Sequence, residues 1–295
     1  MTHYTGQTAF LELGSTTIKL YVISTSGERA GEVEHEEKVP WDLGYDVFEH
    51  GRISPRSISR CLETLRRFQG GYPEIVFATA TAVGTSALRE AQNVEVFRRL
   101  LWEELRLKIH IIEGGIEAFL LETSFRDMVE TYPTGLFDLG GGSLELIEYL
   151  GANSTRKTSL PLGAIRLHCQ LRRARDLLEY IRRAREIVGR TIEENLVGQR
   201  PVYPELIGTG GTVRAIVNCI ERDEITMADV QELIQREVAG PVWPQLKAHR
   251  RRLLLPGLLA TEGVMETLRV ERIVLREASV KRGLISFTSM LPSMA

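Results

Sequence analysis

The sequence predicts an α/β protein built from two related domains. Its 295 residues correspond to about two domains of roughly 150 residues each. Runs of β-branched and apolar residues alternate with helical patterns along the chain. A unit of strand, glycine-rich loop and strand opens the chain and recurs near residue 135. This internal repeat predicts a duplicated domain, with the two α/β halves facing each other across a cleft.

Composition excludes several classes of protein. An apolar fraction of 43% rules out a disordered chain, and a net charge of −2 argues against bulk binding to nucleic acid or anionic membranes. The sequence has no apolar run long enough for a membrane span and no leader pattern at its start. The widely spaced Cys61, Cys169 and Cys219 predict buried thiols in a reducing compartment. We therefore expect a cytoplasmic protein that binds neither DNA nor membranes.

In the first half, strands are expected over 9–13 and 18–23, with a loop over 14–17, and a more exposed strand over 32–39. A helix should begin at Ser54-Pro55, because proline suits the first helical turn, and end at Gly70-Gly71. A buried strand is expected within 74–83. A helix carrying Leu88 and Leu105, a short strand over 109–112 and a helix over 117–125 should follow.

The second half opens in the same way, with strands over 135–139 and 144–150 around a glycine loop. Helices are expected over 174–197, 211–220, 226–238 and 252–268, and strands near 206–207 and 273–275. We expect the first domain to cover 1–124 and the second 125–295, with the last residues free to pack back on the first. The aligned repeat places Glu12 on Asp138, Thr17 on Ser143 and Lys19 on Glu145.

Three glycine-rich loops are candidate phosphate-binding sites. Glycine lets successive backbone N–H groups approach an anion, and serine and threonine hydroxyls add donors. The third loop precedes a helix, whose N-terminus also favours an anion. A tight turn would explain any single loop, but two loops at matching places and a third favour phosphate binding. The candidate residues are Gly14, Ser15, Thr16, Thr17, Gly140, Gly141, Gly142, Ser143, Gly210, Gly211 and Thr212.

Carboxylates stand at the edges of these loops, where they would repel a phosphate. Glu12, Asp138 and Glu145 therefore predict a divalent cation, Mg²⁺ by preference, that joins carboxylates to phosphate oxygens. Each acid taken alone is also explained as an exposed charge at the end of a strand. The histidines lie at scattered spacings and form no metal-binding pattern.

Further charged residues have two interpretations each. Glu117, at the start of an apolar helix, would activate a water molecule or merely complement the helix dipole. Arg89 would reach a phosphate or lie on the surface. The arginine-rich segments 172–175 and 182–185 would form a solvated, salt-bridged helix or a track for a polyanion, and a second basic cluster spans 247–252.

Taken together, these segments resemble the exopolyphosphatase / guanosine pentaphosphate phosphohydrolase family, in its short two-domain form. The family belongs to the actin, sugar-kinase and Hsp70 superfamily. The resemblance spans nearly the whole chain. Its segments are 11–22, 84–93 (GTSALREAQN), 112–118, 138–146 (DLGGGSLEL), 160–167 (LPLGAIRL) and 207–215 (IGTGGTVRA).

The resemblance implies two actin-like (ribonuclease H-like) domains, each with a mixed five-stranded sheet flanked by helices. It also implies a hydrolase that cleaves the terminal phosphoanhydride of inorganic polyphosphate, or converts pppGpp to ppGpp. Glu117 would position water, and Asp138 and Glu145 would hold Mg²⁺ or the catalytic hydrogen bonds. The three loops, with Lys19 and Arg89, would bind phosphates. The implied partner is polyphosphate or a guanosine polyphosphate nucleotide, and a homodimer is left open.

The chain departs from the family pattern at several positions. Glu12 replaces an aspartate, Thr16 and Lys19 replace asparagine and arginine, and Phe119 replaces an arginine. Lysine keeps the charge of arginine but loses its planar fork of donors. Two alternatives therefore stand beside the hydrolase: a polyphosphate- or nucleotide-binding sensor with little turnover, and an ATP-dependent kinase of the same superfamily.

Overall fold

The computed structural model describes residues 6–41, 43–73, 75–125, 128–129, 133–151, 153–196, 202–240, 243–277 and 283. By its contacts the chain forms two compact units, and the first ends at Ile116 and the second begins at Glu117. The division lies near the start of helix α5 (Gly114–Phe125), whereas the expected boundary, 124/125, lies at its end. The expectation that the last residues pack back on the first domain concerns residues outside those described, apart from Gly283.

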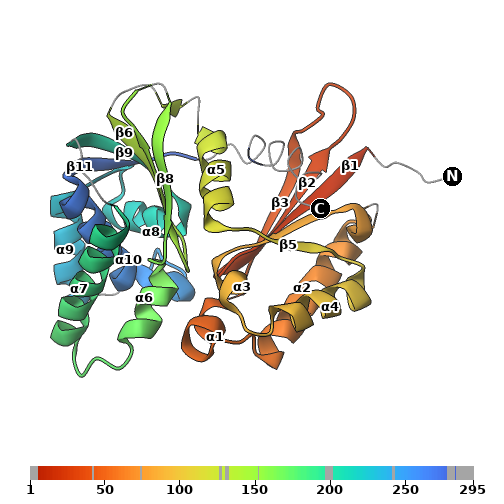
Figure 1. Ribbon diagram of the computed structural model, residues 1–295, viewed down its shortest axis with the longest axis horizontal. Helices are drawn as coiled ribbons and strands as arrows, with labels where there is room; N and C mark the ends of the chain where they lie inside the picture. Colours follow the sequence, from red (N-terminus) through yellow and green to blue (C-terminus); the bar gives the residue numbers. More distant parts are fainter. Residues whose placement is uncertain are drawn as a thin grey trace. The chain divides into compact units, whose positions relative to one another are not determined.

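The first unit contains a five-stranded sheet in the order β3-β2-β1-β4-β5 (Figure 1). The strands β1 to β3 form an antiparallel meander, and β4 and β5 run parallel to β1. Buried apolar residues of the sheet pack against those of the helices in one core. The elements are β1 (Gln7–Leu13), β2 (Thr17–Ser24), β3 (Val33–Pro40), α1 (Leu43–His50), α2 (Pro55–Gly71), η1 (Phe77–Thr79), β4 (Thr81–Gly84), α3 (Ser86–Glu90), α4 (Val94–Leu105) and β5 (Ile109–Ile111).

Local chemistry explains the helix boundaries in the first unit. The hydroxyl of Ser54 accepts the backbone N–H of Ser57, and Pro55 opens α2, as the sequence predicts. The expected helix through Leu88 and Leu105 is instead two helices, α3 and α4. Between them the Asn93 side chain bonds both the N–H and the C=O of Ile53, which draws the chain out of the helix. The strand expected within 74–83 is shorter, because η1 takes its first part.

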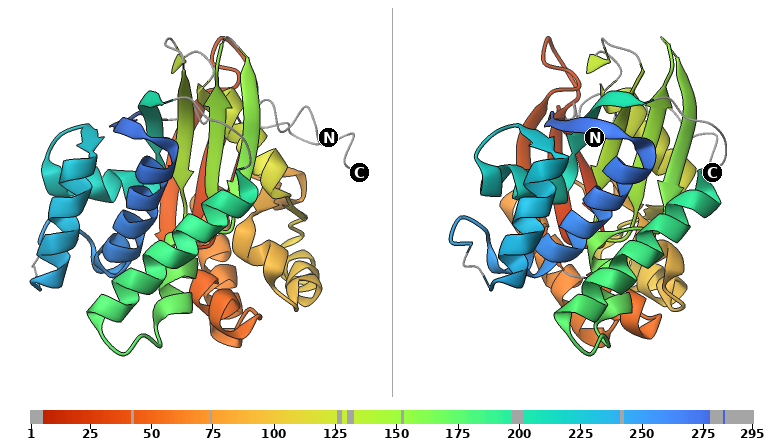
Figure 2. Two further views of the ribbon diagram at one scale, coloured as in Figure 1. Left: turned by 60° about the vertical axis from the view of Figure 1, so that its left-hand side comes forward. Right: turned by 90° about the vertical axis from the view of Figure 1, so that its left-hand side faces the viewer.

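The second unit contains a sheet in the order β10-β11-β9-β6-β7-β8 (Figure 2). It has six strands rather than the expected five, because the short β10 pairs antiparallel with β11 at the edge. The strands are β6 (Thr134–Leu139), β7 (Leu144–Tyr149), β8 (Ser154–Leu160), β9 (Tyr203–Thr209), β10 (Glu224–Thr226) and β11 (Val270–Leu275). The helices after α5 are α6 (Ala164–Leu171), α7 (Leu177–Asn195), α8 (Gly210–Ile220), α9 (Met227–Val238) and α10 (Ala248–Leu268).

Both faces of this second sheet are apolar, and each packs against a different layer. Phe137 and Leu146 pair across β6 and β7 and belong to the large core that includes α7 to α10. Leu136 and Ile147 pair one residue away, point to the opposite face, and contact Phe125 of α5. The helix α5 is therefore joined to the second sheet through its own apolar contacts.

The two sheets confirm the internal repeat. Strands β3-β2-β1-β4-β5 and β8-β7-β6-β9-β11 share one arrangement, an antiparallel meander followed by two parallel strands. Among the described helices, none combines the length and apolar character that crossing a membrane requires. Cys61, Cys169 and Cys219 are all buried, as expected.

Candidate functional site

The glycine loops of the two units have the same backbone geometry. In the first unit the Gly14 N–H donates to the Thr17 carbonyl at 3.0 Å, and in the second the Gly140 N–H donates to the Ser143 carbonyl at the same distance. The residues that flank the loops pair in the same register, Glu12 with Lys19 and Asp138 with Glu145. The residues that the sequence alignment matched therefore occupy equivalent positions in the two units.

The second loop presents its backbone N–H groups on one side. The carbonyls of Gly140 and Gly141 accept hydrogen bonds from backbone N–H groups in the first turn of α6. The Gly142 carbonyl accepts a hydrogen bond from Nε of the buried Arg166 at 2.7 Å. In a trans peptide the C=O and N–H point in opposite directions. The N–H groups of Gly141, Gly142 and Ser143 therefore face away from α6, in the arrangement that binds an oxyanion.

The close approach of α6 to this loop depends on a glycine. A Cβ at Gly163 would lie 2.2 Å from the backbone of Gly141 and Gly142. Sequence reasoning assigned no role to Gly163 or Arg166, although both lie in the LPLGAIRL segment. The signal that would have found them is a glycine and an arginine in the first turns of one helix.

Three carboxylates interact beside the second loop. Glu145 is buried, and its Oε1 accepts the hydroxyl of Ser159 at 2.8 Å. Burial raises the pKa of Glu145 well above its ordinary value, and the negative charges of Glu117 and Asp138 raise it further, whereas hydrogen bonds from Ser159 and Ser143 oppose the rise. Asp138 and Glu145 are thus paired across β6 and β7, and the charge of Glu117 acts on Glu145 as well.

Glu117 is placed by the packing of α5 on the second sheet. It lies in the first turn of α5 and is half-buried. Farther along the helix, Glu122 forms an ion pair with Lys157 of β8 at 2.6 Å, and the Lys157 ammonium lies 5.4 Å from the centroid of the Phe119 ring. The phenylalanine that departs from the family pattern thus contacts a cation of β8.

The third loop lies directly beside Asp138. Strand β9 pairs with β6 so that Thr209 is opposite Asp138, and Gly210 follows with a φ of 89° at the start of α8. A Cβ at Gly210 would stand 2.1 Å from Oδ1 of Asp138. Glycine is required here by both conformation and space, and the N-terminus of α8 is brought to the acidic cluster.

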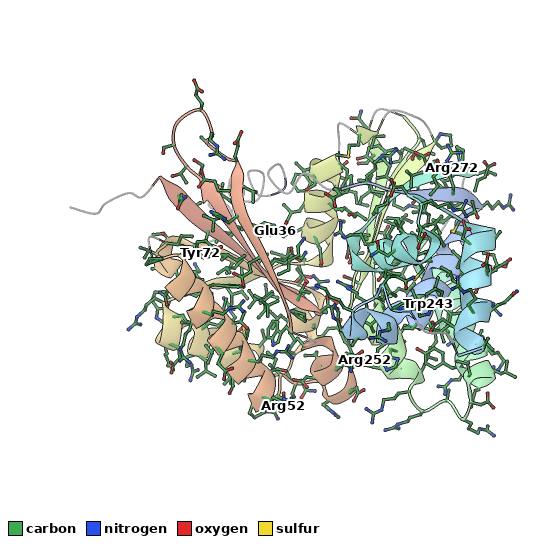
Figure 3. The ribbon with its side chains drawn as sticks, turned by 180° about the vertical axis from the view of Figure 1, so that it is seen from behind. Glu36, Arg52, Tyr72, Trp243, Arg252 and Arg272 are labelled. Atoms are coloured by element: carbon green, nitrogen blue, oxygen red, sulfur yellow. The ribbon has the colours of Figure 1, made fainter. Side chains whose placement is uncertain are left out.

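Arg250 also reaches the third loop. A Cβ at Gly211 would lie 2.2 Å from Nη1 of Arg250, so the guanidinium lies against the loop backbone. Arg250 is in the first turn of α10, and Arg252, labelled in Figure 3, follows in the same basic cluster. The sequence identified this cluster, 247–252, but did not connect it with the loop. Thr212 is buried, and its methyl group contacts Gly257 of α10.

In the first unit, the acid and the base of the repeat neutralise each other. Nζ of Lys19 lies 2.8 Å from Oε1 and 2.9 Å from Oε2 of Glu12. The Ser15 hydroxyl is buried and accepts the backbone N–H of Ala87 at 3.3 Å, which ties the loop to α3. Arg89 of α3 donates to the Ile112 carbonyl at 2.7 Å, at the carboxyl end of β5. The first loop and Arg89 thus lie at the same end of the first sheet.

Among the described residues, no three His, Cys, Asp or Glu side chains form a group that could hold a metal ion. Mg²⁺, however, is commonly bound by one or two carboxylates together with substrate phosphates. Asp138 and Glu145 have this chemistry. Burial chiefly raises the pKa of Glu145, and the charges of Glu117 and Asp138, which raise it further, are ones that a cation would compensate. Glu12 does not fit such a ligand set, because both its carboxylate oxygens already contact Lys19.

The arginine-rich segment of the second unit is laced with ion pairs, as one of its two interpretations predicts. Arg182 lies 2.5 Å from Glu186, and Arg175 and Arg183 both lie within 4.0 Å of Glu179. Each pair joins side chains four residues apart, on α7 or, for Arg175, just before it, which is the pattern of a solvated helix.

Comparison with known proteins connects this geometry to one family. The Ppx/GppA phosphatase family model matches residues 22–293. A guanosine-5'-triphosphate,3'-diphosphate pyrophosphatase of Pseudoalteromonas translucida is 24% identical over 305 aligned positions, which cover 97% of this chain. This chain spans 59% of that relative's length.

Solved structures share the fold. An exopolyphosphatase from Cytophaga hutchinsonii superposes with a TM-score of 0.77 at 22% identity, with coverage of 97% of this chain and 98% of that one. A Ppx/GppA family member from Aquifex aeolicus superposes with a TM-score of 0.72 at 18% identity, with coverage of 97% and 98%. With the family model matching most of its length, this chain belongs to the Ppx/GppA phosphatase family.

Proposed function

We propose that this chain is a phosphohydrolase that removes the terminal phosphate of inorganic polyphosphate or of a guanosine polyphosphate such as pppGpp. The observation that carries the proposal is the pairing of Asp138 with Glu145 across β6 and β7 beside the second loop, where the charge of Glu117 also acts on Glu145. Three carboxylates at an amide-lined loop suit a reaction in which water attacks a bound phosphate. We place this activity in the cytoplasm, where the buried thiols stay reduced.

In the proposed reaction, the N–H groups of Gly141, Gly142 and Ser143 bind oxygens of the terminal phosphate. Glu117 accepts a proton from a water molecule, while the oxygen of that water bonds to the terminal phosphorus. The bond from that phosphorus to the bridging oxygen breaks, and the shortened chain leaves with the electron pair. Arg250 and the N-terminus of α8 bind the phosphates next along the chain.

Mg²⁺ fits this proposal through Asp138 and Glu145. When bound, it would compensate negative charge on the phosphates and on these carboxylates. In the first unit, Gly14 to Thr17, Lys19 and Arg89 remain candidate phosphate contacts, with the charge of Lys19 shared with Glu12.

The test measures orthophosphate release from polyphosphate and from pppGpp in the presence of Mg²⁺. Glu117→Gln should lower kcat about 100-fold or more, because the proton acceptor is lost. Glu113→Gln is the matched control, since Glu113 is exposed and lies four residues earlier, just before α5. It should keep the wild-type rate. Equal rates in Glu117→Gln and the wild type would refute the proposal.

The ion pair between Glu12 and Lys19 favours a second candidate, a sensor with little turnover. The pair neutralises Lys19, on β2 beside the loop, and so leaves less positive charge for a substrate. A sensor would bind polyphosphate or pppGpp tightly while releasing no orthophosphate, and Glu117→Gln would leave that binding unchanged.

A further inference from the structure

A basic pocket lies on the first unit, away from the glycine loop. Its volume is about 420 Å³, and it lies between α4 and the start of β5. The residues that line it are Glu95, Arg98, Arg99, Trp102, Leu107, Lys108 and Ile109. Three cations against one carboxylate leave two positive charges at the pocket, although the chain as a whole carries a net charge of −2.

The spacing along α4 explains why these side chains share one surface. Glu95, Arg98, Arg99 and Trp102 follow each other at intervals of three, one and three residues, so they lie on one face of the helix. Glu95 pairs with Arg98 at 2.9 Å, and both side chains are exposed. Such a pair is weak in water, so a multivalent anion can compete for Arg98.

Trp102 gives the pocket an exposed aromatic wall. Its exposed fraction is 48%, whereas Trp41 and Trp243 are each 2% exposed. The guanidinium of Arg106 lies 5.5 Å from the centroid of the Trp102 ring and adds a further cation beside the pocket. His110 follows Ile109 on β5. Burial and the positive charges of Lys108 and Arg98 lower the pKa of its imidazole.

The topology separates this pocket from the first loop. Strands β1, β4 and β5 are parallel, and the loop and Arg89 lie at their carboxyl ends. The pocket includes Leu107 and Lys108, which precede the amino end of β5. The two sites are therefore at opposite ends of the sheet.

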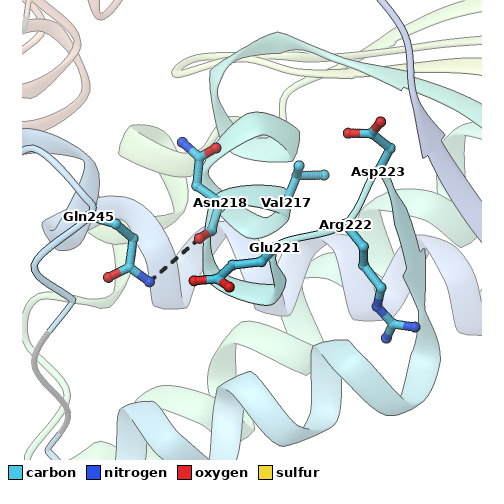
Figure 4. A pocket seen from close by; sticks show the side chains of 6 residues that line it. All are labelled: Val217, Asn218, Glu221, Arg222, Asp223 and Gln245. Carbon is cyan, nitrogen blue, oxygen red and sulfur yellow. Dashed lines mark hydrogen bonds between the residues drawn. The ribbon is translucent and has the colours of Figure 1, made fainter.

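A pocket on the second unit provides a contrast. It measures about 390 Å³ and is lined by Val217, Asn218, Glu221, Arg222, Asp223 and Gln245 (Figure 4). Two carboxylates there outnumber one cation, and Arg222 also pairs with Asp229. Its charge does not favour an anion.

We propose that the pocket formed by Arg98, Arg99, Trp102 and Lys108 is an accessory binding site for linked phosphate groups, separate from the site of hydrolysis. Its cations come from two segments, Arg98 and Arg99 from α4 and Lys108 from the residue before β5, which suits several linked phosphates better than a single phosphate. The phosphates could belong to an inorganic polyphosphate or to a nucleotide. The proposal extends the proposed function, but it concerns equilibrium binding and does not require turnover.

The test uses the full chain with Glu117→Gln, so that substrate is not consumed. Inorganic polyphosphate of defined length should change the fluorescence of the exposed Trp102 in a saturable way. R99E/K108E should weaken this binding about tenfold or more, because it reverses two charges of the pocket. The matched control, R56E/R60E, reverses two exposed charges on α2 of the same unit and should bind as the parent does.

Two further measurements complete the test. With Glu117 intact, R99E/K108E should raise KM for long polyphosphate and leave kcat unchanged, an effect that a fold defect would not produce. Titration with pppGpp and with tripolyphosphate separates the two ligand sources, because a nucleotide requirement would appear only with pppGpp. Equal binding by R99E/K108E and R56E/R60E would overturn the accessory site, whether or not the chain hydrolyses its substrate.

Discussion

Lys157 of β8 and Glu122 of α5 form an ion pair at 2.6 Å, with the glutamate side chain only 8% exposed. The Tyr149 hydroxyl approaches the other carboxylate oxygen of Glu122 at 3.5 Å. Together with the apolar contacts of Phe125, this pair fixes α5 on the second sheet. Glu117 lies in the first turn of the same helix. The pair therefore also orients the residue that is proposed to activate water.

The first prediction concerns this ion pair. Lys157→Met should lower the free energy of unfolding by about 1–3 kcal/mol, because it leaves a buried carboxylate without its cation. The partial exposure of Lys157 keeps the effect below that of a fully buried pair. Adding Glu122→Gln to Lys157→Met should recover most of the loss, which denaturant unfolding would measure.

A control for this prediction is Arg182→Met, which breaks the exposed pair with Glu186 and should cost less than about 0.5 kcal/mol. Lys157→Met should also lower kcat with little change in KM, through the position of Glu117. Equal destabilisation by Lys157→Met and Arg182→Met would contradict the assigned role.

The second prediction compares two glycines with positive φ. Gly240→Ala introduces strain at a φ of 80°, with no atom within 4 Å of the new Cβ, and should cost about 1 kcal/mol. Gly210→Ala adds a clash with Asp138 and should cost about 2–4 kcal/mol. Thermal unfolding measures both.

The two glycine variants should also differ in activity. Gly210→Ala should reduce phosphate release strongly, because Asp138 must move to admit the methyl group. Gly240→Ala should retain the wild-type rate. Equal activity of the two variants would show that phosphate release does not depend on the position of Asp138 beside Gly210.

The third prediction concerns Arg250. Arg250→Ala removes the guanidinium that lies against Gly211 and should raise KM about tenfold through loss of a charge-assisted contact. Arg250→Lys should restore only part of the affinity, since lysine lacks the planar fork. The exposed Arg251 is the neighbouring control, and Arg251→Ala should leave KM unchanged. Steady-state kinetics with both substrates decide the matter.

The fourth prediction concerns the pH dependence of stability at His110. Burial and the charges of Lys108 and Arg98 lower its pKa, so the unfolded chain binds this proton more readily than the folded chain. The stability associated with the neutral imidazole should be lost as pH falls from the ordinary histidine pKa through the lowered folded value. His110→Asn should remove this component from unfolding curves measured across pH. Identical pH profiles for the two proteins would show that His110 keeps its ordinary pKa.

Much of the fold was predictable because its signals are local. The strand and loop repeat at Gly14 and Gly140 and the N-cap at Ser54 each lie within a few residues. Their hydrogen bonds form as the sequence indicates. The division of one expected helix into α3 and α4 was not predictable, because it depends on Asn93 meeting Ile53 from another part of the chain.

The sequence by itself determined the duplicated α/β plan, the order of the three glycine loops and the acids beside them. Only the tertiary structure decided which charged groups meet. It placed Arg250 on Gly211 and Lys157 on Glu122, and it set the charge of Glu117 to act on Glu145. The physical reason is that periodicity and turn chemistry act over neighbouring residues, whereas an ion pair or a carboxylate cluster depends on how whole helices and strands pack.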